Sequence, residues 1–448
     1  FSANRYINRN EGINSSTGQK LWRKAINIIP GGTMLFSKRP ELFLPNIWPT
    51  YFSKAKGCFV WDLDNQKYTD MSTMSVGTNS LGYSNSKIDN AVKKAVDKGN
   101  MSSLNCSEEV FLSKKLLEIN KHFKKIRFTR SGGEANSIAI RIARAASGKD
   151  NIAFNGYHGW HDWYLASNLS SKNNLNKHLL NNLKIKGVPK KLKDTVFPFE
   201  MNSFESLKKL CLKKNVGVIK MEIFRNTKPD IKFLRKIRKF TKKNNIILIF
   251  DECTSGFRQT LGGIHNLYKV NPDILILGKA LGNGYPINAI LGTSKVMDYA
   301  QDSFISSTFW TERLGPVAAL ATLKEMKRTK SWEIISKNGK FIKKKWLEIA
   351  KKYNVEIDVS GLDAIPSFTF RKNHLKYKTF LSYFFLQNNY LAGTTVYLST
   401  AHTKMIINKY LNHLESIFKL IEKFENKEEN FKKYYKGKLS ENFFRRIN

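Results

Sequence analysis

Residues 245–252 read NIILIFDE, an apolar run that ends in two carboxylic acids. Residues 273–279 read DILILGK, a second apolar run that ends in a lysine. Similar short runs end at Arg130, Phe154, Ile223 and Gly292, and amphipathic helical patterns lie among them at 134–146 and 230–243. Short apolar strands that alternate with helices are typical of an α/β domain, so we predict a parallel sheet flanked by helices.

The sequence on either side of this region predicts further elements. Residues 56–71 alternate polar and apolar side chains around a turn at 64–66, which is typical of a β-hairpin. Other patterns predict helices at 85–99 and 108–123, a mostly helical segment at 315–351, antiparallel strands at 355–371 and a long amphipathic helix at 403–425.

Composition excludes several classes of protein. The chain has 448 residues, of which 41% are hydrophobic, and no stretch approaches the ~18 consecutive apolar residues of a membrane span. Lys and Arg number 76 against 36 Asp and Glu, a net charge of +40. Because the lysines are spread over every segment, we interpret this charge as a general compositional bias. Nucleic-acid binding would concentrate the charge on one face, and it stays as an alternative.

The cysteines and the N-terminal sequence indicate the compartment. Cys58, Cys106, Cys211 and Cys253 lie far apart without CxxC spacing, so we expect neither a metal site nor a disulfide framework. The first residues, FSANRYINRNEG, lack the apolar core of a signal peptide. We therefore expect a reducing, cytoplasmic location.

Two glycine-containing segments follow predicted strands, where ligands bind in open α/β sheets. Residues 131–136, SGGEAN, open a helix and expose backbone N–H groups that could hold a phosphate. A tight turn with an N-cap serine is the alternative. Residues 155–163, NGYHGWHDW, bring aromatic rings that could stack on a flat heterocycle or fill the core.

Ionisable residues end the two most apolar strands. A buried Asp251 needs a cationic partner, and a protonated pyridine nitrogen would supply one. Lys279 at a buried strand end is costly as an ammonium, and is therefore suited to a lowered pKa and to Schiff-base formation. A phosphate cradle, an aromatic stacker, a buried acid and a lysine together predict a pyridoxal 5′-phosphate (PLP) enzyme.

Five ordered segments carry a resemblance to a known family. They are SGGEANSIAIRIARAASG (131–148), FNGYHGWHDW (154–163), FDECTSGFR (250–258), DILILGKALGNGYPINAILG (273–292) and ISSTFW (305–310). In order and spacing they resemble the motifs of the class III (omega-type) PLP-dependent aminotransferases, in the branch that contains glutamate-1-semialdehyde 2,1-aminomutase. The resemblance runs from IPGG at Ile29 to STAHT, which ends at Thr403.

The resemblance implies an architecture and a partner. It implies PLP transferase fold type I, with a large, mainly parallel sheet of the seven-stranded type and a smaller α+β domain made from both chain ends. It also implies a homodimer whose active sites are shared between subunits. The parts we expect are an N-terminal contribution to the small domain (1–75), a large PLP-binding domain (76–330), a C-terminal small domain (331–425) and a polar surface tail (426–448).

The same resemblance implies roles for single residues. Lys279 would be the Schiff-base lysine and proton shuttle, and Asp251 the partner of the pyridine nitrogen. The other cofactor contacts that it implies are Ser131, Gly132 and Gly133 for the phosphate, Thr308 reaching the phosphate from the neighbouring subunit, Tyr157 stacking on the ring with His158 beside it, Glu222 near the cofactor edge and Cys253 against the ring.

Departures from the family pattern bear on the substrate. Gly133 stands where the family usually has Thr, and Lys38 stands where the aminomutase has a carboxylate-binding Arg. Phe309, Trp310 and Arg313 predict a pocket of aromatic and cationic character, which would suit an acidic metabolite. We therefore expect an aminotransferase that uses a small amino donor and a carbonyl acceptor. The 2,1-aminomutase reaction is one alternative, and a basic nucleic-acid-associated protein that reuses the fold is another.

Overall fold

The computed structural model describes residues 16–181 and 183–441. The chain forms two compact units: the sheet unit, Ser86–Glu333, and the terminal unit, which combines Phe1–Asn85 with Ile334–Asn448. Residues 76–85, which the sequence assigned to the large domain, belong to the terminal unit. The reason is backbone pairing, because Gly57 and Tyr83 exchange N–H···O bonds of 2.9 and 2.7 Å.

A seven-stranded sheet with strand order β4-β10-β9-β8-β7-β5-β6 is the centre of the sheet unit. The strands are β4 (Lys125–Thr129), β5 (Ile152–Asn155), β6 (Val196–Pro198), β7 (Val218–Glu222), β8 (Ile247–Asp251), β9 (Ile274–Leu277) and β10 (Asn288–Gly292). All of them except β6 were predicted, each to within one residue of its observed end.

Two strands differ from the prediction. β6 is too short to give a strand pattern, and as an edge strand it tolerates the missing N–H of Pro198. β10 runs antiparallel to both β9 and β4. The connection between β9 and β10, residues 278–287, is too short for the helical crossover that a parallel pair requires.

Helix α6 (Gly132–Ser147) packs against β4, β7, β8, β9 and β10. Its start is fixed by a capping box, in which Ser131 Oγ accepts the Glu134 N–H and the Glu134 carboxylate accepts the Ser131 N–H. At its other end Gly148 takes a left-handed conformation with φ 64°, which ends the helix. The glycine-rich turn is therefore held at the carboxyl edge of the sheet.

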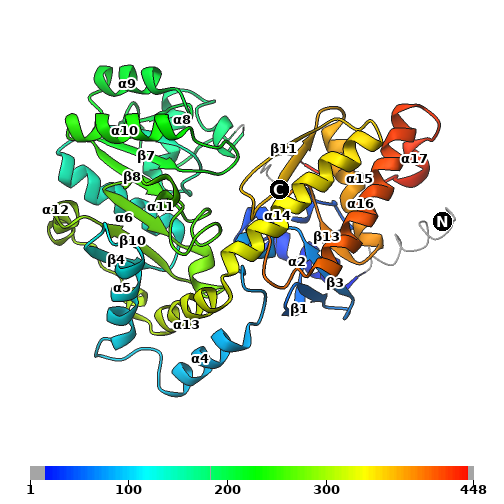
Figure 1. Ribbon diagram of the computed structural model, residues 1–448, viewed down its shortest axis with the longest axis horizontal. Helices are drawn as coiled ribbons and strands as arrows, with labels where there is room; N and C mark the ends of the chain where they lie inside the picture. The colour runs from blue at the N-terminus through cyan, green and yellow to red at the C-terminus, as the bar shows by residue number, and fades with distance from the viewer. Residues whose placement is uncertain (1–15, 182, 442–448) are drawn as a thin grey trace. The chain divides into compact units, whose positions relative to one another are not determined.

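The other helices of the sheet unit lie around this sheet or, like α4, pack on α13, and α9 and α10 lie side by side (Figure 1). They are α4 (Ser86–Asp97), α5 (Ser107–Ile119), α7 (Asp162–Leu165), α8 (Ser167–Ser170), α9 (Phe204–Lys213), α10 (Ile231–Lys243), α11 (His265–Tyr268), α12 (Ser294–Met297) and α13 (Leu314–Thr329). Shorter turns are η3 (Asn176–His178), η4 (Lys190–Leu192), η5 (Lys279–Gly282), η6 (Asp298–Ser303) and η7 (Thr308–Thr311).

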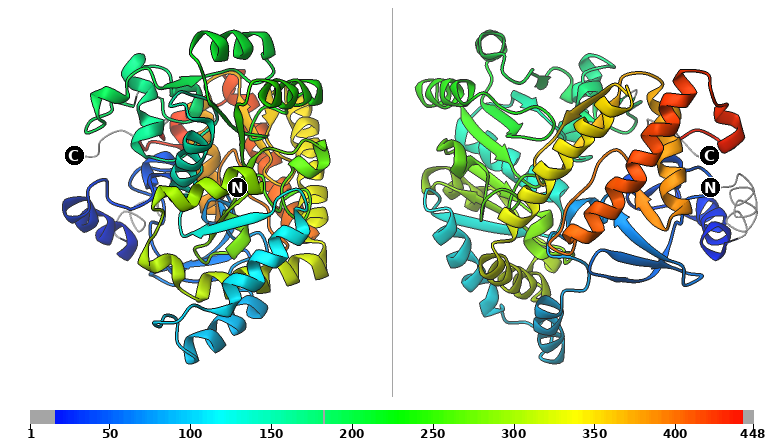
Figure 2. Two further views of the ribbon diagram at one scale, coloured as in Figure 1. Left: turned by 90° about the vertical axis from the view of Figure 1, so that its left-hand side faces the viewer. Right: turned by 45° about the vertical axis from the view of Figure 1, so that its right-hand side comes forward.

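The terminal unit has two small sheets, of which β1, β2 and β3 form an antiparallel meander (Figure 2). β13 joins β3 in parallel, and β11 pairs with β12 antiparallel. Its strands are β1 (Phe52–Lys56), β2 (Phe59–Asp62), β3 (Lys67–Met71), β11 (Ile357–Ser360), β12 (Ser367–Phe370) and β13 (Tyr390–Ala392). Its helical segments are α2 (Thr17–Ile28), η1 (Phe36–Lys38), η2 (Pro40–Leu42), a left-handed turn at α3 (Met74–Gly77), most of α14 (Ser331–Lys352), α15 (His374–Gln387), α16 (Lys404–Glu425) and α17 (Phe431–Tyr434).

The segment after α16 is only partly the polar surface tail that the sequence predicts. Tyr435 and Ser440 are both 3% exposed. The Tyr435 ring packs against Tyr383 with centroids 5.0 Å apart, and the Ser440 N–H donates to Thr379 Oγ1 at 2.9 Å. Single aromatic and hydroxyl side chains, rather than a periodic apolar pattern, thus anchor this segment, which is why the sequence did not reveal it.

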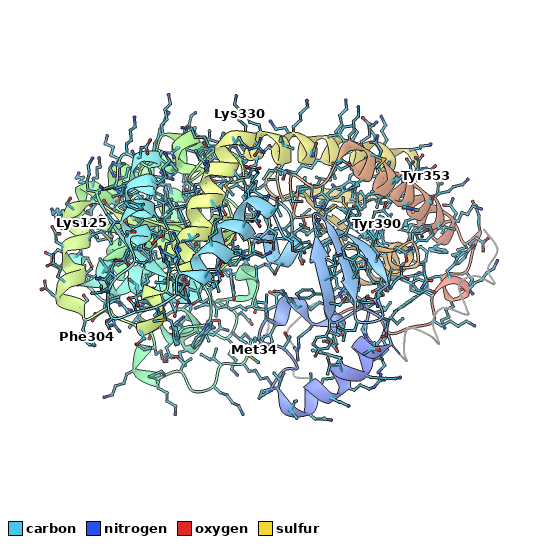
Figure 3. All side chains as sticks on the ribbon, turned by 90° about the horizontal axis from the view of Figure 1, so that it is seen from below. Met34, Lys125, Phe304, Lys330, Tyr353 and Tyr390 are labelled. Atoms are coloured by element: carbon cyan, nitrogen blue, oxygen red, sulfur yellow. The ribbon has the colours of Figure 1, made fainter. Side chains whose placement is uncertain are left out.

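The surface of both units is rich in long side chains that end in nitrogen (Figure 3). This agrees with the even spread of lysines along a chain of net charge +40. Within the described ranges, no helix has both the length and the apolar composition that a membrane crossing requires.

The close approach of α14 to the loop before β12 provides a test of this packing. A Cβ at Gly339 would lie 1.5 Å from the Asp363 carbonyl oxygen. We expect Gly339→Ala to destabilise the protein by about 1–3 kcal/mol, measured by thermal or denaturant unfolding. Gly393→Ala is the control, because its Cβ would meet no atom within 4 Å. Equal stability of the two variants would contradict the packing.

Candidate active site

Three neighbouring strands deliver ionisable residues to one edge of the sheet. Glu222 ends β7 and Asp251 ends β8, and the two are paired in the parallel register. β9 ends at Leu277, and Lys279 follows after one residue. All residues of β7 and β9 are buried, so the ionisable groups at this edge lie at the end of a fully buried part of the sheet.

The carboxylate of Asp251 is 4% exposed and has a partner on each oxygen. Oδ1 accepts the Cys253 N–H at 3.1 Å, and Oδ2 lies 2.9 Å from His158 Nδ1 and 3.6 Å from Lys220 Nζ. Burial alone would raise the pKa of Asp251. The Lys220 ammonium and then the His158 hydrogen bond outweigh it and hold this pKa well below its ordinary value.

The half-buried Lys279 has a defined amine position and a strained backbone. Its Nζ donates to Thr254 Oγ1 at 2.8 Å. Its φ of 45° lies in the left-handed region, which costs a residue other than glycine about 1–3 kcal/mol. The preceding residue must be glycine, because a Cβ on Gly278 would lie 1.9 Å from Asn288 Oδ1. Lys279 and Asp251 thus contact two adjacent residues, Thr254 and Cys253.

The loop after β5 is bound to the same edge. The Tyr157 N–H donates to Glu222 Oε2 at 2.9 Å, and Arg225 Nη1 forms an ion pair with Glu222 at 2.9 Å. His158 is fully buried, and its Nε2 lies 3.0 Å from the Asn155 carbonyl oxygen. Two predicted cofactor ligands, Tyr157 and His158, therefore also hold the loop at the sheet edge, Tyr157 through Glu222 and His158 through Asp251.

The glycine-rich turn lies beneath this loop. Ser131 Oγ accepts the Glu134 N–H at 3.3 Å, so the hydroxyl proton of Ser131 can still be donated. Gly132 and Gly133 are in the first helical turn, where N–H groups have no intrahelical acceptor. A Cβ on Gly133 would lie 2.9 Å from His161 Nε2. The loop thus occupies the space that the family's usual threonine would need.

These observations fit PLP. The anionic Asp251 suits a protonated pyridine nitrogen, and the Lys279 amine suits the aldehyde carbon. The N–H groups at the start of α6, with the helix dipole behind them, suit the phosphate. Tyr157 is 36% exposed, and its aromatic ring suits stacking on the cofactor ring.

A cavity of about 710 Å³ opens beside Tyr157 at the ends of β5, β6 and β7. Its charged lining is balanced, because Glu222 pairs with Arg225 and Glu200 pairs with Lys177. Asparagine side chains, including Asn155, Asn173 and Asn226, contribute amide groups. The lining suits a polar molecule without a strong preference for charge.

The structure does not bring every predicted residue into this cluster. Thr308 is exposed on η7, where its carbonyl accepts the Thr311 hydroxyl. Arg313 does not offer a free cation, because its guanidinium binds Glu108 Oε1 at 2.7 and 3.1 Å. The expectation of a cationic pocket built on Arg313 is therefore wrong, and the reason is an acid from α5 that lies far away in the sequence.

Sequence analysis missed Lys220, Thr254 and Asn288 as members of the site. For Lys220 a signal existed, since it is a lysine inside the apolar run VIKMEI. Thr254 follows the predicted acid pair but has no spacing that marks it. Asn288 is 5% exposed at the start of β10, where one amide among apolar residues gave only a weak signal.

Comparison with known proteins identifies the family. Residues 45–425 match the model of the class-III aminotransferases. The chain is 31% identical over 375 residues to 3-aminobutyryl-CoA aminotransferase of Cloacimonas acidaminovorans, covering 81% of this chain and 86% of that protein. It is 32% identical over 328 residues to glutamate-1-semialdehyde 2,1-aminomutase of Sulfolobus acidocaldarius, covering 71% of this chain and 76% of that one. The protein belongs to the class-III aminotransferase family.

A solved structure agrees with this assignment. The PLP internal aldimine form of the FumI protein of Sphingopyxis sp. MTA144 superposes with a TM-score of 0.82 at 24% identity, over 91% of this chain and 97% of that one. The predicted fold type I is confirmed, and this chain is a PLP-dependent enzyme of the aminotransferase class.

The contact between the glycine-rich turn and the loop above it can be tested. We expect Gly133→Ala to destabilise the cofactor-free protein by about 1–3 kcal/mol, because the new Cβ would crowd His161 and Trp160. Gly132→Ala is the matched control, since its Cβ would come no closer than 3.8 Å to Cys253 Sγ. Melting temperatures measure the difference, and identical values for the two variants would show that the loop does not rest on Gly133.

Proposed function

We propose that the protein transfers an amino group from an amine or amino-acid donor to a separate carbonyl acceptor, with Lys279 holding the cofactor as a Schiff base. The position of the Lys279 amine supports this proposal. Its Nζ donates to Thr254, and the preceding residue, Cys253, donates its N–H to Asp251. PLP, when bound, supplies an electron sink that stabilises negative charge on the donor carbon.

The residues of the chain would perform the remaining tasks. Asp251 keeps a proton on the ring nitrogen, and the Lys279 amine takes the proton from the donor carbon and later returns it. Ser131, Gly132 and Gly133 hold the phosphate through N–H and O–H donors. Tyr157 covers one ring face and excludes water from it.

Differences in sequence favour an aminotransferase over a 2,1-aminomutase. Phe309 and Trp310 replace small residues of the aminomutase pattern, and Lys38 replaces its carboxylate-binding arginine. One relative of the chain is a 3-aminobutyryl-CoA aminotransferase, a name that denotes transfer of an amino group. The balanced polar lining of the 710 Å³ cavity supports a polar, uncharged portion of the substrate.

The central test is the replacement of Lys279. We expect Lys279→Ala to lower turnover by at least about 100-fold, because it removes both the covalent anchor and the proton-carrying amine. Turnover is measured with an amino donor and a carbonyl acceptor, and the absorbance of bound PLP reports loss of the Schiff base. Lys295→Ala, which changes an exposed lysine on α12, is the control and should be fully active.

The choice between transferase and mutase follows from the same assay. Repeated turnover with a donor and an acceptor that are different molecules supports the transferase. Conversion of a single amino-aldehyde without an acceptor, and no exchange between separate substrates, would establish the mutase instead. Unchanged turnover in Lys279→Ala would reject both reactions at this lysine.

We also propose a homodimer in which Thr308 completes the phosphate site of the neighbouring subunit. Large apolar side chains are exposed on the sheet unit, among them Leu104 (84%), Phe304 (90%, labelled in Figure 3) and Phe309 (69%). Such side chains are candidates for burial against a second copy. Thr308 lies next to Phe309 on η7. Among the hydrogen bonds of the described residues, none joins Thr308 to the predicted phosphate ligands at 131–133 of the same chain.

Mixing two inactive variants tests this shared site. Thr308→Asp should weaken cofactor binding, because the added carboxylate would repel the phosphate. Lys279→Ala alone should also be inactive. When the two variants exchange subunits, we expect activity to return, because one site of each hybrid dimer has a native Lys279 and a native Thr308. Hybrid dimers that form, by native mass spectrometry, yet stay inactive would exclude the shared site.

A cytoplasmic location is part of the same proposal. Cys58, Cys106, Cys211 and Cys253 are free thiols in the structure. Burial raises the pKa of Cys58 and of Cys211 to about 12, so both behave as packing residues. Free cysteines of this kind are typical of a reducing compartment.

A further inference from the structure

Lys220 is a lysine in the middle of β7, and its side chain is fully buried. Its neighbours in the register are Phe154 on β5 and Ile249 on β8, both apolar. Side chains two residues apart share one face of a strand, so Lys220 lies on the face of Glu222, one step deeper in the sheet. Its amine reaches the carboxyl edge, where Nζ is 3.6 Å from Asp251 Oδ2.

Stability does not explain this lysine. Its Nζ has no hydrogen-bond partner among the described residues. Burial lowers the pKa of Lys220, and Asp251 raises it. A buried ion pair is commonly no more stable than apolar residues of the same size, so an apolar side chain such as methionine would fill this position without the cost of a buried ammonium.

The groups around Lys220 leave Asp251 as its counter-charge. On β7, Glu222 is already bound to Arg225 at 2.9 and 3.2 Å. After β8, burial raises the pKa of the Cys253 thiol, which is therefore neutral. After β5, burial and then Lys220 lower the pKa of His158. Lys220 and Asp251 are thus a nearly isolated charge pair beneath the proposed position of the ring nitrogen.

We propose that Lys220 is a proton-linked counter-ion of Asp251, charged while Asp251 has no other cation and neutral once the ring nitrogen of the cofactor lies against Asp251. The inference rests on the proposed role of Asp251. One buried carboxylate cannot balance two buried cations without a large desolvation cost. A proton therefore leaves Lys220 Nζ for solvent while the ring nitrogen keeps its own, and no other bond changes. Lys220 is in this sense a positioning residue that acts through Asp251.

Proton release on cofactor binding tests the inference. PLP is titrated into cofactor-free protein at pH 7.5 in buffers of different ionisation enthalpy, and calorimetry gives the protons released per site. We expect the native protein to release about one proton more than Lys220→Met, in which this position cannot titrate. The release from Lys279 is common to both and cancels. Lys220→Gln is a second neutral variant if the methionine variant does not fold.

A permanently charged side chain gives the opposite test. Lys220→Arg cannot lose its proton, so Asp251 would stay paired with it. We expect PLP to bind this variant at least about tenfold more weakly, and its ring nitrogen, labelled with ¹⁵N and observed by NMR, to lose its proton. In the native protein and in Lys220→Met the ring nitrogen should stay protonated.

The outcomes separate the two proposals. If PLP does not bind the native protein, the proposed function fails, and this inference fails with it. If PLP binds but the native protein and Lys220→Met release equal numbers of protons, Lys220 is only structural. An identical ring-nitrogen protonation state in the arginine and methionine variants would likewise overturn the proton linkage.

Discussion

The buried carboxylate of Asp251 is the constraint on which the rest of the site depends. A charge at 4% exposure is stable only where partners are already in place. These partners are the Cys253 N–H, His158 and Lys220, which come from the β8 turn, the β5 loop and β7. The contacts that keep Asp251 ionised therefore also hold the β8 turn, the β5 loop and β7 together at the sheet edge.

The second constraint is steric. The loop after β5 lies so close to the start of α6 that a Cβ on Gly159 would meet the Gly133 Cα at 3.2 Å. Position 133 is held to glycine by the same loop, because a Cβ on Gly133 would lie 2.9 Å from His161 Nε2. A threonine side chain at this position would therefore collide with the loop that carries Tyr157 and His158. Backbone N–H groups and Ser131 remain as phosphate donors, so the cradle does not depend on the missing side chain.

Much of this organisation could be predicted from the sequence because strands and their ends have local signals. Apolar runs predicted six strands, and the ends of two of them pointed to Asp251 and Lys279, the two proposed catalytic residues. β6 has three residues and no periodicity, and the direction of β10 depends on the length of a connection. Arg313 was misinterpreted because its partner, Glu108, lies 205 positions away in the chain.

By itself the sequence determined the strand-helix alternation, the family and the residue types that suit PLP, since each depends on neighbours along the chain. Only the tertiary structure decided which charges meet. It paired Arg313 with Glu108, and it placed the amine of Lys220 under Asp251. Electrostatic energy depends on distances of a few ångströms between groups on different strands and loops, and no local pattern of the chain encodes those distances.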